Sequence, residues 1–76
     1  MSRTFYAIVY AYGRSVVNNG NRADHVHQFA TVGERTAFID SMERDGHEAD
    51  PILATNPTVK KALRYAAQSQ EWPIAV

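Results

Sequence analysis

The chain contains no cysteine, and this absence excludes two devices that commonly stabilise very small domains. Without thiols there is neither a disulfide framework nor a thiolate zinc site, so a secreted, disulfide-rich scaffold is not expected. The sequence also has no apolar run near the roughly 20 residues that a membrane span needs, and its first residues lack the pattern of an export signal. We therefore expect a cytoplasmic protein of a host cell.

Signatures of catalysis are also missing. No serine lies in a G-x-S-x-G turn, no cysteine nucleophile exists, and the four glycines do not form a phosphate-binding loop. His25 and His27 are two apart, as ligands on one strand would be, but no third ligand with an established metal spacing accompanies them. We predict no enzyme activity, no metal site and no cofactor.

The length of 76 residues indicates one domain, residues 1–76, because each half of a divided chain would bury too little apolar surface. Apolar residues make up 45% of the chain and aromatic residues 11%, which favours a compact globular fold.

Charge is balanced in sum, with eight basic and eight acidic residues, but it is unevenly distributed. Between Glu34 and Asp50 there are six acidic residues against two arginines. Such asymmetry can steer association with a charged partner, although a solvated helix face has the same composition. Lys60, Lys61 and Arg64 form a basic ridge, while the overall pI of about 6.8 argues against bulk electrostatic binding of DNA.

Two strands are expected in the first half of the chain. Residues 4–12 alternate so that both faces of a strand are apolar or aromatic, which is typical of a central strand. Asn18-Asn19-Gly20-Asn21 favours a reversal, and residues 25–31 then form a second strand paired with the first. A short extra strand at residues 15–17 remains an alternative.

Helix signals follow. Thr31 and Glu34 have the spacing of a capping box, which predicts a helix over residues 32–45 ended by Gly46. Asn56-Pro57 predicts the start of a second helix that ends near Gln70. Residues 51–55 between them suit an edge strand or an extended connection. Residues 72–76 are expected to fold back on the core.

These elements define an α+β fold. We predict a small antiparallel sheet of two to four strands with two helices packed on one face, in the order strand, strand, helix, strand, helix.

Aromatic residues suggest one binding mode. Adjacent antiparallel strands can present five ring-bearing side chains from one sheet face: Tyr6, Tyr10, Tyr12, His25 and His27. Aromatic sheet faces stack nucleobases, with basic residues nearby to hold phosphates, so a small RNA-binding module is one interpretation. The alternative is that these tyrosines pack under a helix.

Three segments carry a resemblance: Phe5–Gly13, Asn18–Asp24 and Val26–Thr31. Together they resemble small phage and prophage proteins over about the first 40 residues. Chains of this kind, partly acidic and without cysteine or catalytic motifs, are similar in kind to anti-CRISPR inhibitors, which bind a host surveillance complex or nuclease. The resemblance implies an inhibitor of a host protein or ribonucleoprotein complex, with Cas proteins as the expected partners.

The residues expected to contact the partner come from three regions. The acidic segment would occupy a basic nucleic-acid groove on the target, and tyrosines and the asparagine-rich loop would supply uncharged contacts. The candidate partner-binding residues are Tyr10, Tyr12, Asn19, Asn21, Arg22, Asp24, Asp40 and Glu43. Whether the chain acts as a monomer or as a homodimer is left open, and a subunit that works only as an oligomer is a third interpretation.

Overall fold

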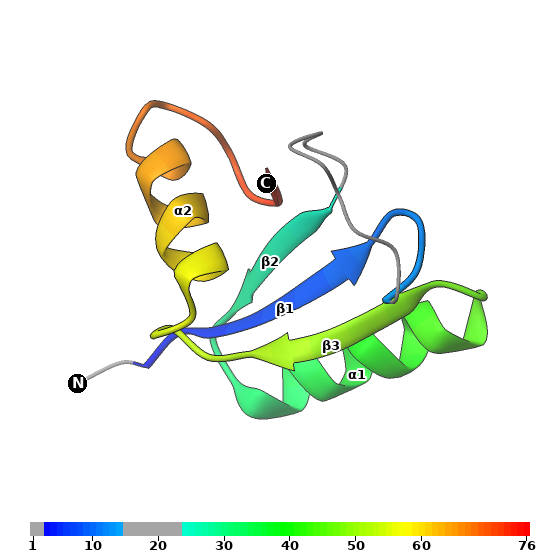
Figure 1. Ribbon diagram of the computed structural model, residues 1–76. Helices are drawn as coiled ribbons and strands as arrows, with labels where there is room; N and C mark the ends of the chain where they lie inside the picture. The colour runs from blue at the N-terminus through cyan, green and yellow to red at the C-terminus, as the bar shows by residue number, and fades with distance from the viewer. Residues whose placement is uncertain (1–2, 15–23) are drawn as a thin grey trace.

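The computed structural model describes residues 3–14 and 24–76 (Figure 1). Its elements follow the order β1 (Phe5–Tyr10), β2 (His25–Phe29), α1 (Val32–Arg44), β3 (Glu48–Ile52), α2 (Pro57–Ala66) and β4 (Ile74–Ala75). The strands form one sheet in the order β3-β1-β2-β4, and each neighbouring pair is antiparallel. The predicted α+β class and the antiparallel sheet are confirmed.

β1 lies inside the sheet, as its two apolar faces predict. It pairs with β2 from Phe5↔Phe29 to Val9↔His25, which confirms the hairpin pairing of the first two strands. β3 forms the edge on the other side of β1, and its fourth residue is Pro51, which has no N–H to donate. β3 begins at Glu48 and so includes acidic residues that we had not placed on a strand. The suggested extra strand at residues 15–17 lies outside the described residues.

The prediction that both helices pack on one face is wrong, because the register places them on opposite faces. Phe38 of α1 contacts the rings of His27 and Phe29, whose β1 partners are Ala7 and Phe5. α2 instead packs with Tyr6 and Val26, which belong to the other face. Two helices on opposite faces allow both apolar sides of β1 to be covered (Figure 1).

α1 begins at the predicted cap. The Thr31 hydroxyl accepts a hydrogen bond from the Glu34 N–H at 3.1 Å, and the Glu34 carboxylate accepts one from the Ala30 N–H at 3.2 Å. The acidic side chain therefore turns back one residue further than in the usual capping box. The helix ends at Arg44, and Gly46 follows with a φ of +87°.

α2 and the C-terminal segment close the buried core. The Asn56 side chain accepts a hydrogen bond from the Thr58 N–H, and Pro57 is at the first helical turn, as predicted. The helix ends at Ala66, earlier than expected. Val59 and Ala62 pack with the C-terminal residues Ile74 and Val76, while the Trp72 ring lies 5.8 Å from that of Tyr6. The expectation that residues 72–76 fold back on the core is confirmed, and they add the short strand β4.

Candidate interaction surface

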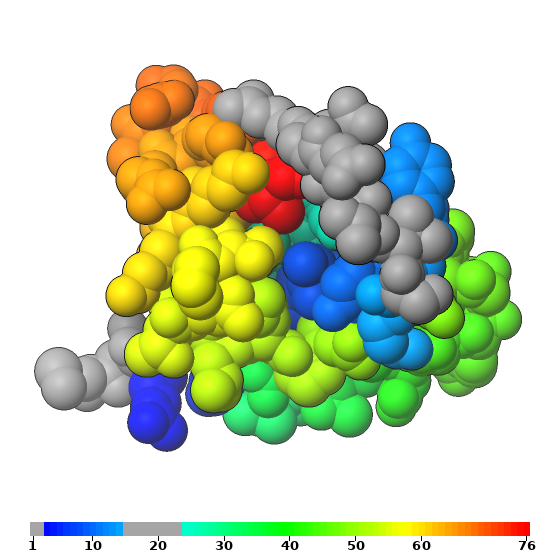
Figure 2. All heavy atoms as spheres, in the orientation of Figure 1, coloured from blue at the N-terminus to red at the C-terminus, as the bar shows by residue number. Residues whose placement is uncertain are grey.

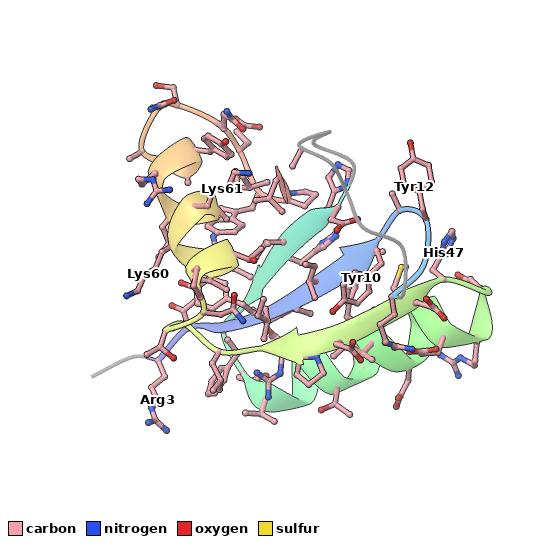
Figure 3. All side chains as sticks on the ribbon, in the orientation of Figure 1. Arg3, Tyr10, Tyr12, His47, Lys60 and Lys61 are labelled. Carbon is pink, nitrogen blue, oxygen red and sulfur yellow. The ribbon has the colours of Figure 1, made fainter. Side chains whose placement is uncertain are left out.

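The end of the molecule where β1 finishes, α1 ends and β3 begins gathers exposed and charged side chains. Figure 3 shows Tyr12 and His47 at this end, on the turns that follow β1 and α1. Tyr12 is 64% exposed, so most of its ring and hydroxyl face solvent. We call this region, with Asp40, Glu43, Asp45, Glu48 and Asp50, the acidic end.

Arg14 joins three elements within the acidic end. Its Nε donates to Asp50 Oδ2 at 2.7 Å and its Nη2 to Asp50 Oδ1 at 3.0 Å, so the carboxylate of β3 is held by a fork of two bonds. Nη2 also lies 3.0 Å from Glu43 Oε1 of α1 and 3.0 Å from the Ala49 carbonyl oxygen. Nη1 lies 3.8 Å from Glu48 Oε1. One guanidinium therefore connects the turn after β1 to α1 and β3.

A glycine makes this arrangement possible. Gly13 has a φ of +94°, and a Cβ at this position would lie 2.9 Å from Glu48 Oε2. The same Glu48 carboxylate oxygen accepts a hydrogen bond from the Arg14 N–H. The backbone angle therefore favours glycine here, and a side chain at this position would require the Glu48 carboxylate to shift.

Negative charge exceeds positive charge at the acidic end. Hydrogen bonds from Arg14 lower the pKa of Asp50, and the carboxylates in turn raise the pKa of Arg14 above its usual range. A single guanidinium faces three carboxylates here, so the cluster retains negative charge. Partial burial and a hydrogen bond to Asp50 raise the pKa of Tyr10, which keeps its hydroxyl protonated and donating.

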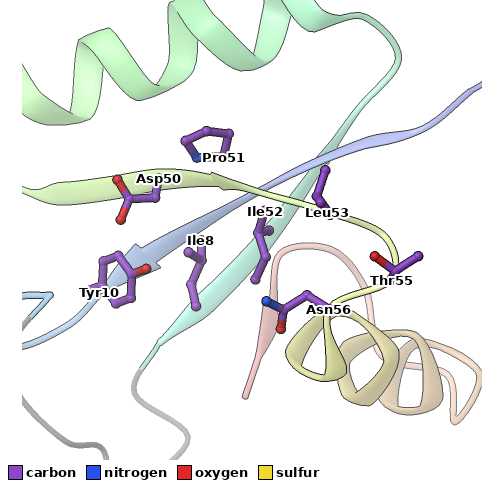
Figure 4. Close-up of a pocket in the computed structure, with 8 residues that line it drawn as sticks. All are labelled: Ile8, Tyr10, Asp50, Pro51, Ile52, Leu53, Thr55 and Asn56. Atoms are coloured by element: carbon purple, nitrogen blue, oxygen red, sulfur yellow. The ribbon is translucent and has the colours of Figure 1, made fainter.

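A groove runs from Tyr10 along the sheet to the start of α2. It has a volume of about 540 Å³, with Ile8 and Ile52 on its floor and Asn56 at its far end. Figure 4 shows Tyr10, Ile8 and Ile52 projecting from the same face of the sheet, and Figure 2 shows the hollow between the first turn of α2 and the segment after β1. The groove extends the acidic end with a mixed surface, in which polar groups such as those of Asp50 and Asn56 border the apolar side chains.

The predicted partner-binding residues divide into three groups. Tyr10, Tyr12 and Glu43 meet at the acidic end, and Asp40 lies exposed one turn before Glu43 on α1. Asp24 instead has structural bonds: its carboxylate accepts the Ala11 N–H at 3.0 Å, and its carbonyl oxygen accepts the Val76 N–H at 2.9 Å. Asn19, Asn21 and Arg22 lie outside the described residues.

The five-ring sheet face that would stack RNA does not form. Tyr6 is opposite Gln28 and Ala7 is opposite His27, so the two histidines lie on the α1 side, Tyr6 and Tyr10 lie on the α2 side, and Tyr12 lies in the turn after β1. Tyr6 is also buried in the core. His27 packs against Phe38 at 4.4 Å between ring centres, and burial lowers its pKa.

Sequence reasoning placed Glu48 and Asp50 in the acidic segment but missed their bonds to Arg14. The hydrogen bonds of Arg14 join residues 29 to 36 positions away in sequence, so no local pattern indicates them. The one available signal was Gly13 directly before Arg14, because a glycine at a turn often marks a close approach between segments.

The opposite end of the molecule is basic. Figure 3 shows Lys60 and Lys61 on α2, with Arg3 below them at the start of β1. Arg64 is exposed on the next turn of α2. Carboxylates thus predominate at one end of the molecule and Lys60, Lys61, Arg64 and Arg3 lie toward the other, along a longest dimension of 34 Å.

Residues 3–14 and 24–76 contain no group of three or more histidine, aspartate or glutamate side chains placed to hold a metal ion. Among the helices described, none combines the length and the apolar character needed to cross a bilayer. In comparisons with known proteins, the chain matches no family model, no curated protein and no solved structure.

Proposed function

We propose that the protein is a non-catalytic binding module that places its acidic end on a basic surface of a host macromolecular complex. The observation that supports this is the gathering of five carboxylates at one end, where, among residues 3–14 and 24–76, the basic residues at that end are Arg14 and Arg44. Charge of one sign at one end orients the molecule as it approaches a partner and raises the association rate.

The partner class follows from this charge. Grooves that hold nucleic acid are basic, and a compact acidic surface competes for them directly. Together with the resemblance to small phage proteins, this favours an inhibitor of the anti-CRISPR kind that acts on a Cas surveillance complex. Tyr12 would supply the central uncharged contact, because an exposed ring offers a large apolar area and a hydroxyl.

The first experiment is a pull-down of the tagged protein from bacterial lysates that contain CRISPR surveillance complexes, with and without nuclease. Recovery of Cas subunits that survives nuclease is the expected result. Recovery of RNA alone, lost after nuclease treatment, would contradict the inhibitor assignment and favour RNA binding.

Charge variants test the surface. The double variant Asp40→Asn with Asp45→Asn removes two carboxylates that do not contact Arg14, so the turn stays intact. We expect retention of Cas subunits to fall about tenfold, with a smaller effect in high salt. The matched control, Gln68→Lys with Glu71→Gln, changes the net charge equally at the other end and should leave retention unchanged. An equal loss in both variants would show that only the overall charge matters.

The Tyr12→Ala variant tests whether the Tyr12 ring contacts the partner, because it leaves the net charge unchanged. The ring projects from a turn and supports no buried residue, so the variant should keep its stability. We expect it to weaken partner retention about tenfold or more, as truncation of a central aromatic contact does. The control is Leu63→Ala, an exposed apolar residue of α2 that lines neither the acidic end nor its groove; equal retention by the two variants would remove Tyr12 from the interface.

A further inference from the structure

A second surface lies at the opposite end from the proposed partner contact. It is a shallow depression of about 410 Å³ where β1 begins, β3 ends and α1 makes its first turn. Its walls include the side chains of Arg3, Phe5, Arg35, Ile52 and Leu53. No carboxylate is among the lining residues.

Arg35 has an incomplete set of partners. Its guanidinium lies over the Phe5 ring at 5.4 Å, and its Nε is buried without a hydrogen-bond partner. Buried donors are almost always paired in folded proteins, so a ligand of this depression would need a hydrogen-bond acceptor within reach of this N–H. Within residues 3–14 and 24–76, Arg35 forms no ion pair, in contrast to the heavily engaged Arg14.

The surroundings of Arg35 add positive charge. Arg3 lines the same depression and likewise has no ion pair within the described part of the chain. Arg35 is in the first turn of α1, where the helix dipole favours an anion. Glu34, the neighbouring acid, is already engaged with the Ala30 N–H. The depression therefore offers two guanidiniums that form no ion pair within the described residues.

The remainder of the wall is apolar. Leu53 is 73% exposed, and the Phe5 ring and Ile52 are partly buried beside it. A ligand with charge alone would leave this apolar area in water, while one with an apolar group alone would leave the guanidiniums unpaired. The wall therefore fits a ligand that has both a negative charge and an apolar group.

We propose that this depression binds a carboxylate adjacent to a large apolar side chain, as found in an acidic segment of a partner protein that contains leucine or phenylalanine. A carboxylate accepts two parallel N–H bonds from a guanidinium, and a small rotation of the Arg35 side chain brings Nε into that fork. The apolar side chain packs on Leu53 and Phe5. This site is independent of the acidic end.

The test is a titration of the ¹⁵N-labelled protein followed by NMR, with small molecules that separate the two requirements. N-acetyl-leucine carries both the carboxylate and the apolar group, N-acetyl-leucinamide lacks the carboxylate, and acetate lacks the apolar group. We expect N-acetyl-leucine to shift the signals of Arg35 Nε–H, Phe5 and Leu53, with saturation in the millimolar range that suits so few atoms. The other two compounds should bind at least tenfold more weakly.

A matched pair of variants tests whether the Arg35 guanidinium binds N-acetyl-leucine. Arg35→Gln should weaken N-acetyl-leucine about tenfold, whereas Arg44→Gln, on the same helix but outside the depression, should not change it. Far-UV circular dichroism of both variants confirms that α1 is retained. Equal binding of wild type and Arg35→Gln would overturn the proposal, as would equal shifts with acetate and N-acetyl-leucine.

Phenyl phosphate distinguishes a phosphate ligand from a carboxylate ligand. Preference for N-acetyl-leucine over phenyl phosphate supports a protein segment as the occupant. Tenfold tighter binding of phenyl phosphate, dependent on Arg3 and Arg35, would overturn that assignment and indicate a phosphorylated or nucleic-acid ligand.

Discussion

Gly13 is the residue on which the turn at the acidic end depends. In the Gly13→Ala variant, the new methyl group would meet the Glu48 carboxylate, and the backbone would keep a φ that disfavours side chains. We expect a loss of about 1–2 kcal/mol from the backbone angle alone, with an added cost from Glu48. Urea unfolding measures it.

Gly46 supplies the matched control. It also has a positive φ, +87°, but a Cβ there would meet nothing within 4 Å. Gly46→Ala should therefore lose only the backbone contribution and be less destabilised than Gly13→Ala. Equal losses would mean that the space filled by Glu48 has no energetic role.

His27 makes stability depend on pH. Burial first, and the neighbouring His25 charge second, lower its pKa in the folded state. The unfolded chain therefore binds the proton more readily, so the contribution to stability is present above about pH 6.5 and is lost as pH falls through the folded-state pKa. Unfolding free energies at pH 7.5 and 5.0 measure this loss.

Two variants test whether His27 causes the dependence of stability on pH. His27→Phe keeps a ring against Phe38 but cannot titrate, so it should lose much of the change between pH 7.5 and 5.0. His47→Gln changes an exposed histidine of the turn after α1 and should retain it. The same pH dependence in wild type and His27→Phe would assign it to other groups.

At the scale of elements, Arg14 couples β3 to the turn after β1 and to α1. Replacement by glutamine removes the fork to Asp50 and leaves Glu43, Glu48 and Asp50 facing one another. We expect the pKa of Asp50 to rise, because the hydrogen bonds from Arg14 are the main cause of its low value. Carboxyl ¹³C shifts followed by NMR during acid titration measure the change. An unchanged Asp50 pKa would contradict the described fork.

The helix boundaries show what local sequence signals can predict. The side chains of Thr31 and Asn56 accept hydrogen bonds from backbone N–H groups three and two residues further on, so short sequence patterns predict both caps. The start of β3 was harder to predict, because Glu48 and Asp50 are held by Arg14, which is distant in sequence. Polar residues on an edge strand give little alternation to recognise.

Local sequence patterns did not predict which side chains of β1 and β2 lie on the same face of the sheet. The alternation within β1 correctly predicts that Tyr6 and Tyr10 lie on one face of the sheet and Ala7 on the other. It does not predict which residues of β2 share a face with the tyrosines. A shift of one residue in the pairing would have put His27 beside the tyrosines, and the actual register puts it under α1. Register depends on the connection between strands and on packing, and for that reason the sequence left open whether the five rings share one face.

For the whole molecule, the core depends on its C-terminal residues. Ile74 is fully buried with Val26, Val59 and Ala62. Ile74→Ala should cost about 2–5 kcal/mol, a large part of the stability of so small a domain. Urea unfolding measures this loss. Leu53→Ala removes the same atoms from an exposed position and should change stability by less than about 0.5 kcal/mol, so similar losses would contradict the described core.

The placement of the two helices on opposite faces divides the protein into layers that should open separately. α1 has no fully buried residue, whereas α2 contributes Val59 and Ala62 to the core. Amide hydrogen exchange should therefore be faster in α1, through local opening that leaves β1, β2 and α2 folded. A partner that binds the acidic end would slow exchange in the last turn of α1, which offers a way to detect binding without knowledge of the interface.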